Sequence, residues 1–181
     1  MRKEAIFLVG YMGSGKTTMG RKLARRLGWS FVDLDHRIVA EIGMSIPEYF
    51  DAHGEEAFRD VERDLLRALD LSGQVVVGTG GGTPCFHDNM AWMNAHGVTV
   101  YLRMSSKALW RRLGRSDVST RPVLRGLKGE DLLRFIEEKL STRSPYYEQA
   151  VITVDPIRDN PADIIDNYRL TQDKVVRSKK S

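Results

Sequence analysis

The sequence predicts an α/β fold, a three-layer α/β/α arrangement built on a five-stranded parallel sheet. Five short apolar segments alternate with segments of helical periodicity along the 181 residues. The first apolar segment runs straight into a glycine-rich turn that opens a helix. This length suits one hydrophobic core and is too short for two. We therefore expect one domain over residues 1–172 and a basic, disordered tail over 173–181.

The five predicted strands are short apolar runs. They cover residues 5–9, 31–35, 75–77, 98–102 and 151–154. Because helical segments separate them, the sheet is predicted to be parallel and to be covered on both faces.

The predicted helices have recognisable ends. The first covers residues 16–27 and stops at Gly28. Ser45 caps the next helix, with Pro47 in its first turn and Glu48 three residues after the cap. Gly54 breaks this helix. Further helices are predicted over 55–69, over 87–95, from Ser105 or Ser106 onward, over 130–148 and over 162–170.

Residues 10–17 read G-Y-M-G-S-G-K-T and match the phosphate-binding pattern G-x-x-x-x-G-K-[ST]. The glycines let successive N–H groups point at phosphate oxygens, and the following helix adds its positive N-terminal end. Lys16 can reach the β- and γ-phosphates, and the Thr17 hydroxyl can ligate Mg²⁺. A glycine-rich turn with a chance lysine is the alternative, and the flanking strand and helix argue against it. We expect a nucleoside triphosphate to contact Gly13, Ser14, Gly15, Lys16, Thr17 and Thr18.

The second predicted strand ends in two acids, Asp33 and Asp35. The carboxyl ends of parallel strands face the ligand crevice, and residues spaced i, i+2 share one side of an extended strand end. One carboxylate is therefore expected near Mg²⁺ and the other near a substrate hydroxyl. The alternative is a polar strand end, or a cap for a helix that begins at His36.

A run of three glycines, Gly80, Gly81 and Gly82, follows the third predicted strand. Consecutive glycines cost conformational entropy and contribute no packing. A ligand close to the backbone would explain them, and a tight turn between strand and helix is the other explanation. Because this strand should also end at the crevice, we favour the ligand.

Residues 114–129 lose the apolar period and become polar and basic, with Arg121 near the middle. Such a stretch within one domain is either a disordered insert or a moving lid. In a phosphoryl-transfer enzyme a lid excludes water and can deliver an arginine to the transferring phosphate.

The composition restricts the other classes of partner. The net charge is +4, and residues 174–181 alone hold four basic residues and no acid. In the rest of the chain the basic and acidic residues are equal in number, so we expect no nucleic-acid partner.

The single cysteine, Cys85, excludes an internal disulfide and a cysteine-rich zinc site, and we expect it to be a small buried filler. No signal or membrane-spanning segment is evident, which favours a cytoplasmic protein; we expect a monomer.

Taken together, these features resemble shikimate kinase over nearly the whole chain. The features are the phosphate loop at 10–17, Asp33-Leu34-Asp35, Phe58-Arg59 with Glu62, Gly80–Gly82, Arg121-Pro122-Val123-Leu124, and Arg143 before Pro145-Tyr146. The resemblance implies a P-loop kinase fold with strand order 2-3-1-4-5. It also implies transfer of the ATP γ-phosphoryl group to the 3-hydroxyl of shikimate, in aromatic amino-acid biosynthesis.

For the nucleotide, the resemblance implies that Lys16 holds the β- and γ-phosphates and that Arg121 neutralises charge on them. It implies that Thr17 ligates Mg²⁺ and that Asp33 supports the ion through water. Arg112 and the loop around Arg158 would flank the adenine.

For the acceptor, the resemblance implies a binding segment at about residues 34–62. Asp35 would bind the hydroxyls and would accept or orient the proton of the attacking one. Arg59 and Arg143 would grip the carboxylate, and the backbone of Gly80, Gly81 and Gly82 would contact the ring. Thr83-Pro84-Cys85 is less typical of the family.

Three rival functions fit parts of the pattern. One is a non-catalytic member of the kinase fold, although all the polar positions needed for chemistry are filled. A gluconate-type or nucleoside-monophosphate kinase would share the phosphate loop. The combination of Arg59, Arg143 and Asp35 suits a carboxylate-bearing polyol better than a nucleobase. A nucleotide-dependent nucleic-acid-binding factor would use the basic lid and tail, but no RNA-binding motif accompanies them.

Overall fold

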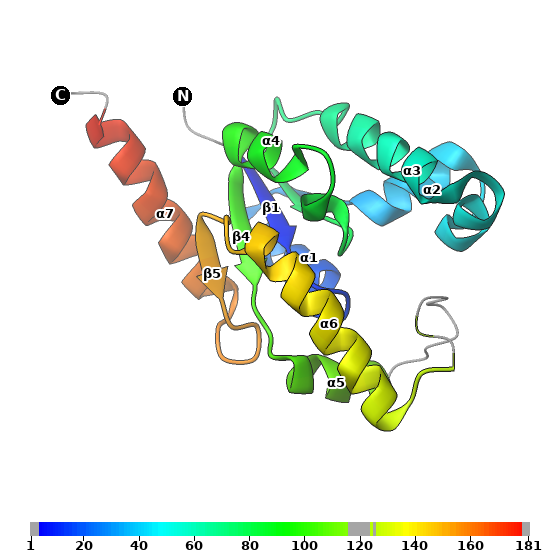
Figure 1. The fold of residues 1–181 in the computed structure, drawn as a ribbon. Coiled ribbons are helices and arrows are strands. Elements are labelled where there is room, and N and C mark those ends of the chain that lie inside the picture. The colour runs from blue at the N-terminus through cyan, green and yellow to red at the C-terminus, as the bar shows by residue number, and fades with distance from the viewer. Residues whose placement is uncertain (1–3, 116–123, 125, 179–181) are drawn as a thin grey trace.

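The computed structural model describes residues 4–115, 124 and 126–178 and contains a five-stranded parallel sheet (Figure 1). The strand order is β2-β3-β1-β4-β5, which confirms the predicted order. The strands are β1 (Ala5–Val9), β2 (Ser30–Asp33), β3 (Val75–Gly78), β4 (Val98–Leu102) and β5 (Ile152–Val154). The three-layer α/β prediction is therefore confirmed.

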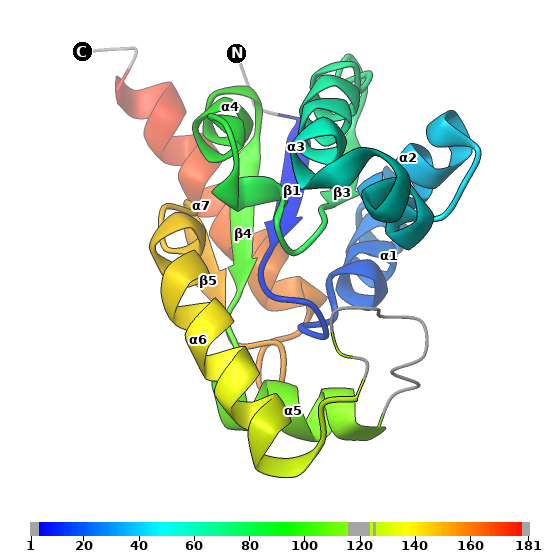
Figure 2. The same cartoon turned by 45° about the vertical axis from the view of Figure 1, so that its right-hand side comes forward.

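The central strand β1 is buried along its whole length. It pairs with β3 on one side, starting at Ala5 opposite Val75, and with β4 on the other, starting at Ile6 opposite Val98. Successive side chains point to opposite faces of a strand, so the apolar run is buried on both faces. Figure 2 shows β4 running toward α5 (Ser106–Arg115), and this edge of the sheet carries the carboxyl ends of all five strands.

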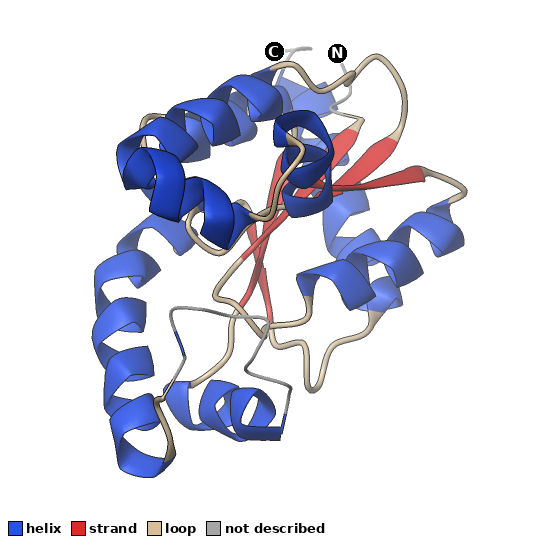
Figure 3. Ribbon diagram, turned by 90° about the vertical axis from the view of Figure 1, so that its right-hand side faces the viewer, coloured by secondary structure: helices blue, strands red, loops and turns tan. Residues whose placement is uncertain are grey.

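Helices cover both faces of the sheet, as Figure 3 shows. On one face, α1 (Lys16–Leu27) and α7 (Pro161–Ser178) pack on the side chains of Ile6 and Leu8. The other face, with Phe7 and Val9, is covered by side chains from α2 (Leu34–Ile42), α3 (Ile46–Arg67), α4 (Asn89–His96), α5 and α6 (Gly129–Tyr147). A short 3₁₀ turn, η1 (Thr83–Cys85), precedes α4.

The predicted helix ends are formed by the residues that signalled them. Ser45 and Glu48 form a reciprocal capping box at the start of α3. Gly28 ends α1 with φ of 72°, in the left-handed region. Gly54 breaks the helical geometry inside α3 with φ of 82°, so the two predicted helices are one element with a kink.

Two predictions need correction. Asp33 ends β2 and caps α2, which begins at Leu34, so Asp35 lies in the first turn of a helix and not on a strand end. Helix α7 continues to Ser178, beyond the predicted end at residue 170, and includes residues 173–178 of the predicted tail.

No helix within the described ranges has both the length and the apolar character needed to cross a membrane.

Candidate active site

The phosphate loop connects β1 to α1 and is shaped by glycines at two tight positions. Gly10 has φ of 140°, and a Cβ there would lie 2.9 Å from the carbonyl oxygen of Leu102 at the end of β4. Gly15 has φ of 96° directly before the first residue of α1. Neither conformation suits a residue with a side chain, and backbone at this point can approach a ligand closely. The loop therefore has the geometry that the motif predicted.

Lys16 and Thr17 begin α1 inside the loop. The Lys16 ammonium is buried and donates to the carbonyl oxygens of Gly10 at 2.7 Å and Tyr11 at 3.0 Å. The Thr17 hydroxyl donates to Asp33 Oδ2 at 2.8 Å. These contacts join the start of α1 to the loop on one side and to the end of β2 on the other.

A cleft of about 640 Å³ opens in front of these residues. Its lining includes the loop, both predicted acids, Gly81 and Arg112. Arg112 Nη1 donates to the carbonyl oxygens of Gly13 at 3.3 Å and Ser14 at 3.2 Å, so α5 is bound to the loop from the side. The predicted nucleotide contacts Gly13, Ser14, Gly15, Lys16, Thr17 and Thr18 all line this cleft.

Arg158 differs from the other predicted nucleotide residues. Its side chain is 86% exposed and lies 3.7 Å from Asp155, and it does not line the cleft. Pro156, from the same loop after β5, does line it. Arg121 and most of the predicted lid, residues 116–123 and 125, lie outside the described residues.

Asp35 faces the cleft from the first turn of α2. Burial raises the pKa of its carboxyl above the ordinary value, and the Lys16 ammonium opposes this rise. The carboxylates of Glu62 and Asp33 add to the rise, since a nearby negative charge disfavours a second one. A half-buried carboxylate with a raised pKa in a cleft can accept a proton or a hydrogen bond from a substrate hydroxyl.

The triple glycine forms a corner beside Asp35. A Cβ on Gly80 would lie 2.8 Å from Asp35 Oδ1, and a Cβ on Gly82 would lie 2.7 Å from Arg59 Nη2. A Cβ on Gly81 would lie 3.2 Å from the backbone nitrogen of Met12 in the phosphate loop. The glycines therefore leave room for charged side chains and the phosphate loop to approach this backbone closely.

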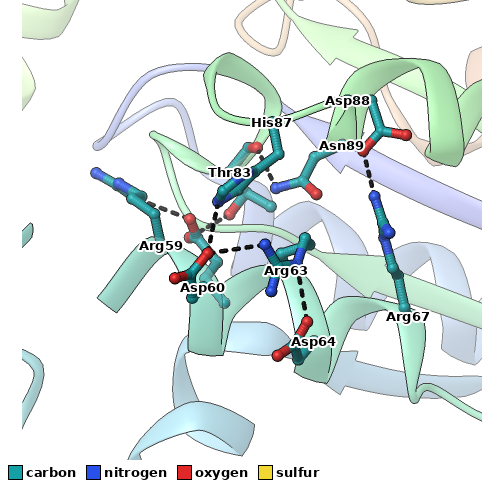
Figure 4. Close-up of polar contacts among 10 residues, drawn as sticks. Arg59, Asp60, Arg63, Asp64, Arg67, Thr83, His87, Asp88 and Asn89 are labelled. Atoms are coloured by element: carbon teal, nitrogen blue, oxygen red, sulfur yellow. Dashed lines mark hydrogen bonds and ion pairs between the residues drawn. The ribbon is translucent and has the colours of Figure 1, made fainter. Parts of the chain in front are cut away.

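Arg59 lies in this corner and is held by ion pairs and an aromatic ring, and Figure 4 shows one of its polar contacts. Its guanidinium donates to Glu62 Oε2 at 2.8 Å and to Glu55 Oε1 at 3.0 Å. Its Cζ lies 4.0 Å from the ring centroid of Phe86. Arg59 is 8% exposed and Glu62 is 1% exposed, so this is a buried ion pair and not a solvated surface pair.

Arg143 approaches the same corner from α6. Its Nη1 would lie 3.7 Å from a Cβ on Gly81, and its Cζ lies 5.7 Å from the ring centroid of Tyr11. The buried Tyr147 hydroxyl donates to the carbonyl oxygen of Gly81 at 2.5 Å. Burial raises the pKa of Tyr147, and the neighbouring Arg143 guanidinium opposes this rise only in part.

Sequence reasoning missed Phe86 and Tyr147. Both are aromatic residues outside the phosphate motif, and their roles depend on contacts with distant segments. Tyr147 directly follows Pro145-Tyr146 in the sequence, but nothing in the local pattern indicated that its hydroxyl contacts Gly81.

Cys85 is half-buried, and burial raises the pKa of its thiol to about 11, which fits an unreactive filler.

Thr17 and Asp33 fit a magnesium ion. Both side chains present oxygen atoms, the ligands that Mg²⁺ prefers, at the phosphate end of the cleft. The Thr17 hydroxyl donates its proton to Asp33, so its lone pairs are left for a metal ion. Mg²⁺ at phosphate sites is usually bound by one or two protein groups together with phosphates and water.

A family model described as shikimate kinase matches residues 12–172. The chain belongs to the shikimate kinase family. A shikimate kinase of Parabacteroides distasonis is 49% identical over 152 residues, which cover 84% of this chain and 87% of that protein. Membership in the family decides against the gluconate-type and nucleoside-monophosphate kinase alternatives.

Solved structures of shikimate kinases share the fold. A crystal structure from Bacteroides thetaiotaomicron has a TM-score of 0.81 and 39% identity, covering 94% of this chain and 97% of that one. A shikimate kinase from Acinetobacter baumannii, in complex with shikimate, has a TM-score of 0.79 and 33% identity, covering 98% of this chain and 94% of that one.

Proposed function

We propose that this member of the shikimate kinase family transfers the γ-phosphoryl group of ATP to the 3-hydroxyl of shikimate in the crevice described above. One observation carries the assignment of the site. Gly81 lies against the phosphate loop at Met12 and against Arg143, so the arginine-lined corner and the phosphate cleft share one wall. An acceptor bound in the corner would have its hydroxyl beside the γ-phosphate.

The nucleotide end uses the loop backbone, Lys16 and Thr17. Lys16 Nζ, already directed into the loop, would bind the β- and γ-phosphate oxygens. Thr17 would ligate Mg²⁺, with Asp33 holding the hydroxyl and the water shell of the ion. The bound Mg²⁺ would neutralise charge on the phosphates. We retain Arg121 as a contributor to the same charge neutralisation, on the resemblance alone.

The acceptor end uses two arginines and one aspartate. Arg59 and Arg143 would bind the carboxylate, since planar guanidinium groups match its two oxygens. Glu55 accepts a hydrogen bond from Arg59 Nη2, a group that the acceptor carboxylate would also need. Because the Glu55 side chain is 55% exposed, it can move aside when the acceptor binds. Asp35 would accept hydrogen bonds from the ring hydroxyls.

The chemical step would depend on positioning and charge more than on proton abstraction. Phosphoryl transfer passes through a loose transition state with little bonding to the attacking oxygen. Holding both substrates in line in one crevice removes much of the entropic barrier. Asp35 would orient the attacking hydroxyl and take its proton as the new O–P bond forms, while ADP leaves.

A coupled assay of ADP release tests this function. The purified chain is supplied with Mg²⁺ and ATP, and then with shikimate, gluconate or a nucleoside monophosphate in separate reactions. We expect shikimate alone to stimulate ADP release strongly. If another acceptor stimulates ADP release and shikimate does not, the assignment of the acceptor site is wrong, whereas the assignment of the nucleotide site is unaffected.

A further inference from the structure

Thr83 lies behind the acceptor corner, where it is completely buried and does not line the cleft. Its hydroxyl donates to Glu62 Oε1 at 2.6 Å, and Glu62 Oε2 accepts from Arg59 Nη1 at 2.8 Å. Thr83, Glu62 and Arg59 thus form a continuous buried chain of charge-assisted hydrogen bonds. Figure 4 shows Thr83 and Arg59 at its two ends.

The start of α4 fixes the position of Thr83. Asn89 is completely buried, and its amide Nδ2 donates to the carbonyl oxygen of Thr83 at 3.0 Å. More exposed contacts join the same segments: Arg67 pairs with Asp88, and His87 Nε2 lies 3.4 Å from Asp60 (Figure 4). The turn that carries Thr83 is therefore held in place independently of its hydroxyl.

Glu62 depends on the Thr83 hydroxyl. A carboxylate that is 1% exposed loses its hydration, and buried charges are tolerated only when both oxygens are paired. Arg59 occupies one oxygen, and Thr83 occupies the other. Without the hydroxyl, Glu62 Oε1 would lose its donor and the carboxylate could turn, which would change the direction of the Arg59 guanidinium.

We propose that Thr83 is a positioning residue for the acceptor: it orients Glu62, and Glu62 aims Arg59 at the acceptor carboxylate. This inference rests on the proposed function, because it assumes that Arg59 binds the carboxylate of shikimate. It adds Thr83 to the acceptor residues that the resemblance names.

The test compares Thr83→Val, which keeps the shape and removes the hydroxyl, with Thr83→Ser, which keeps the donor. We expect Thr83→Val to raise the KM for shikimate by about tenfold, the scale of one hydrogen bond to a charged group. The KM for ATP should stay within about twofold of the wild-type value. Thr83→Ser should restore the KM for shikimate. An unchanged KM for shikimate in Thr83→Val would overturn the proposal.

A matched control separates positioning from loss of stability. Thr99 is another completely buried threonine, in β4 and away from the cleft, and its hydroxyl donates to Asn94 Oδ1 at 2.5 Å. Thr99→Val removes this hydrogen bond and the one that the hydroxyl accepts from the Val151 backbone N–H at 3.0 Å, so it should lower the Tm at least as much as Thr83→Val without raising the KM for shikimate. If Thr99→Val raises that KM as much as Thr83→Val, the effect is one of stability and the proposal is wrong.

A double-mutant cycle identifies the route through Arg59. When Arg59 is already replaced by leucine, adding Thr83→Val should change the affinity for shikimate, measured by calorimetry, by less than about twofold. Additive losses would show that Thr83 does not act through Arg59. If the wild-type protein neither binds nor phosphorylates shikimate, the proposed function itself fails, and this outcome is distinct from both results above.

Discussion

The hydroxyl of Thr17 and the carboxylate of Asp33 are joined by a hydrogen bond of 2.8 Å, which links the first turn of α1 to the end of β2. The bond fixes both the position of the hydroxyl and the direction of its proton. It also leaves the hydroxyl lone pairs toward the cleft, where a metal ion with phosphate ligands would lie. The first prediction follows from this pairing.

Thr17→Val should raise the Mg²⁺ concentration needed for half-maximal activity by about tenfold or more, because it removes a metal ligand and the hydrogen bond that Asp33 Oδ2 accepts from it. The measurement is a titration of Mg²⁺ at fixed ATP and shikimate. Thr17→Ser keeps the hydroxyl and should behave like the wild type. An unchanged Mg²⁺ dependence in Thr17→Val would show that the ion is held elsewhere.

Asp35→Asn should lower kcat by about 10²-fold or more, since the amide cannot take the proton of the attacking hydroxyl. The same variant should raise the Tm at neutral pH. Burial raises the pKa of Asp35, so the folded state holds this proton more tightly than the unfolded chain does. Its contribution to stability is therefore present at low pH and is lost as the pH rises through the raised, folded-state pKa.

Thermal unfolding between pH 4 and pH 8 checks the sign of this effect. The wild-type Tm should fall relative to that of Asp35→Asn as the pH rises, and the variant should lack this part of the pH dependence. A lower Tm for Asp35→Asn at neutral pH would contradict the role given to burial.

Arg143→Ala should raise the KM for shikimate by about 100-fold, the scale expected when one partner of a buried charge pair is removed. The KM for ATP should change little. Arg134 offers the control, because it lies on the same helix, is 75% exposed and pairs with Asp131 one turn away. Arg134→Ala should leave both KM values unchanged, and equal effects of the two variants would reject the acceptor assignment.

Gly82→Ala should raise the KM for shikimate without affecting that for ATP. The new methyl group would lie 2.7 Å from Arg59 Nη2, so the guanidinium must move from its present position. Gly73→Ala is the matched control, because a Cβ at Gly73 meets no atom within 4 Å. The measurement is the steady-state KM for shikimate and for ATP in both variants. A normal KM for shikimate in Gly82→Ala would show that Arg59 can shift without loss of acceptor binding.

The nucleotide end of the site was predictable because its signals are local. The phosphate loop, Lys16 and Thr17 lie in one short segment, and their spacing alone predicts the geometry. The sheet order was available only through the resemblance, since periodicity does not say which strands are neighbours. Asp35 was assigned to the crevice for an incorrect reason: Asp33 caps a helix there, so the residue reaches the cleft from α2 and not from a strand.

The contacts around the acceptor corner depend on the tertiary fold. Tyr147 reaches Gly81 across 66 positions of the chain, and Phe86 covers an arginine from another helix. The end of α7 was misjudged because a run of basic residues was interpreted as a frayed tail. Residues 171–178 contain neither proline nor glycine, so the backbone itself offers no reason for the helix to stop earlier.

The register of β1 has a consequence for synthesis on the ribosome. This strand is made first, yet its hydrogen-bonding partners are residues 75–78 on one side and 98–101 on the other. Until those residues have emerged, a nascent chain carries a fully apolar strand with both edges open, which is a risk for aggregation. The phosphate loop therefore gains the support of its neighbouring strands only after β4 has been translated, although its motif directly follows β1.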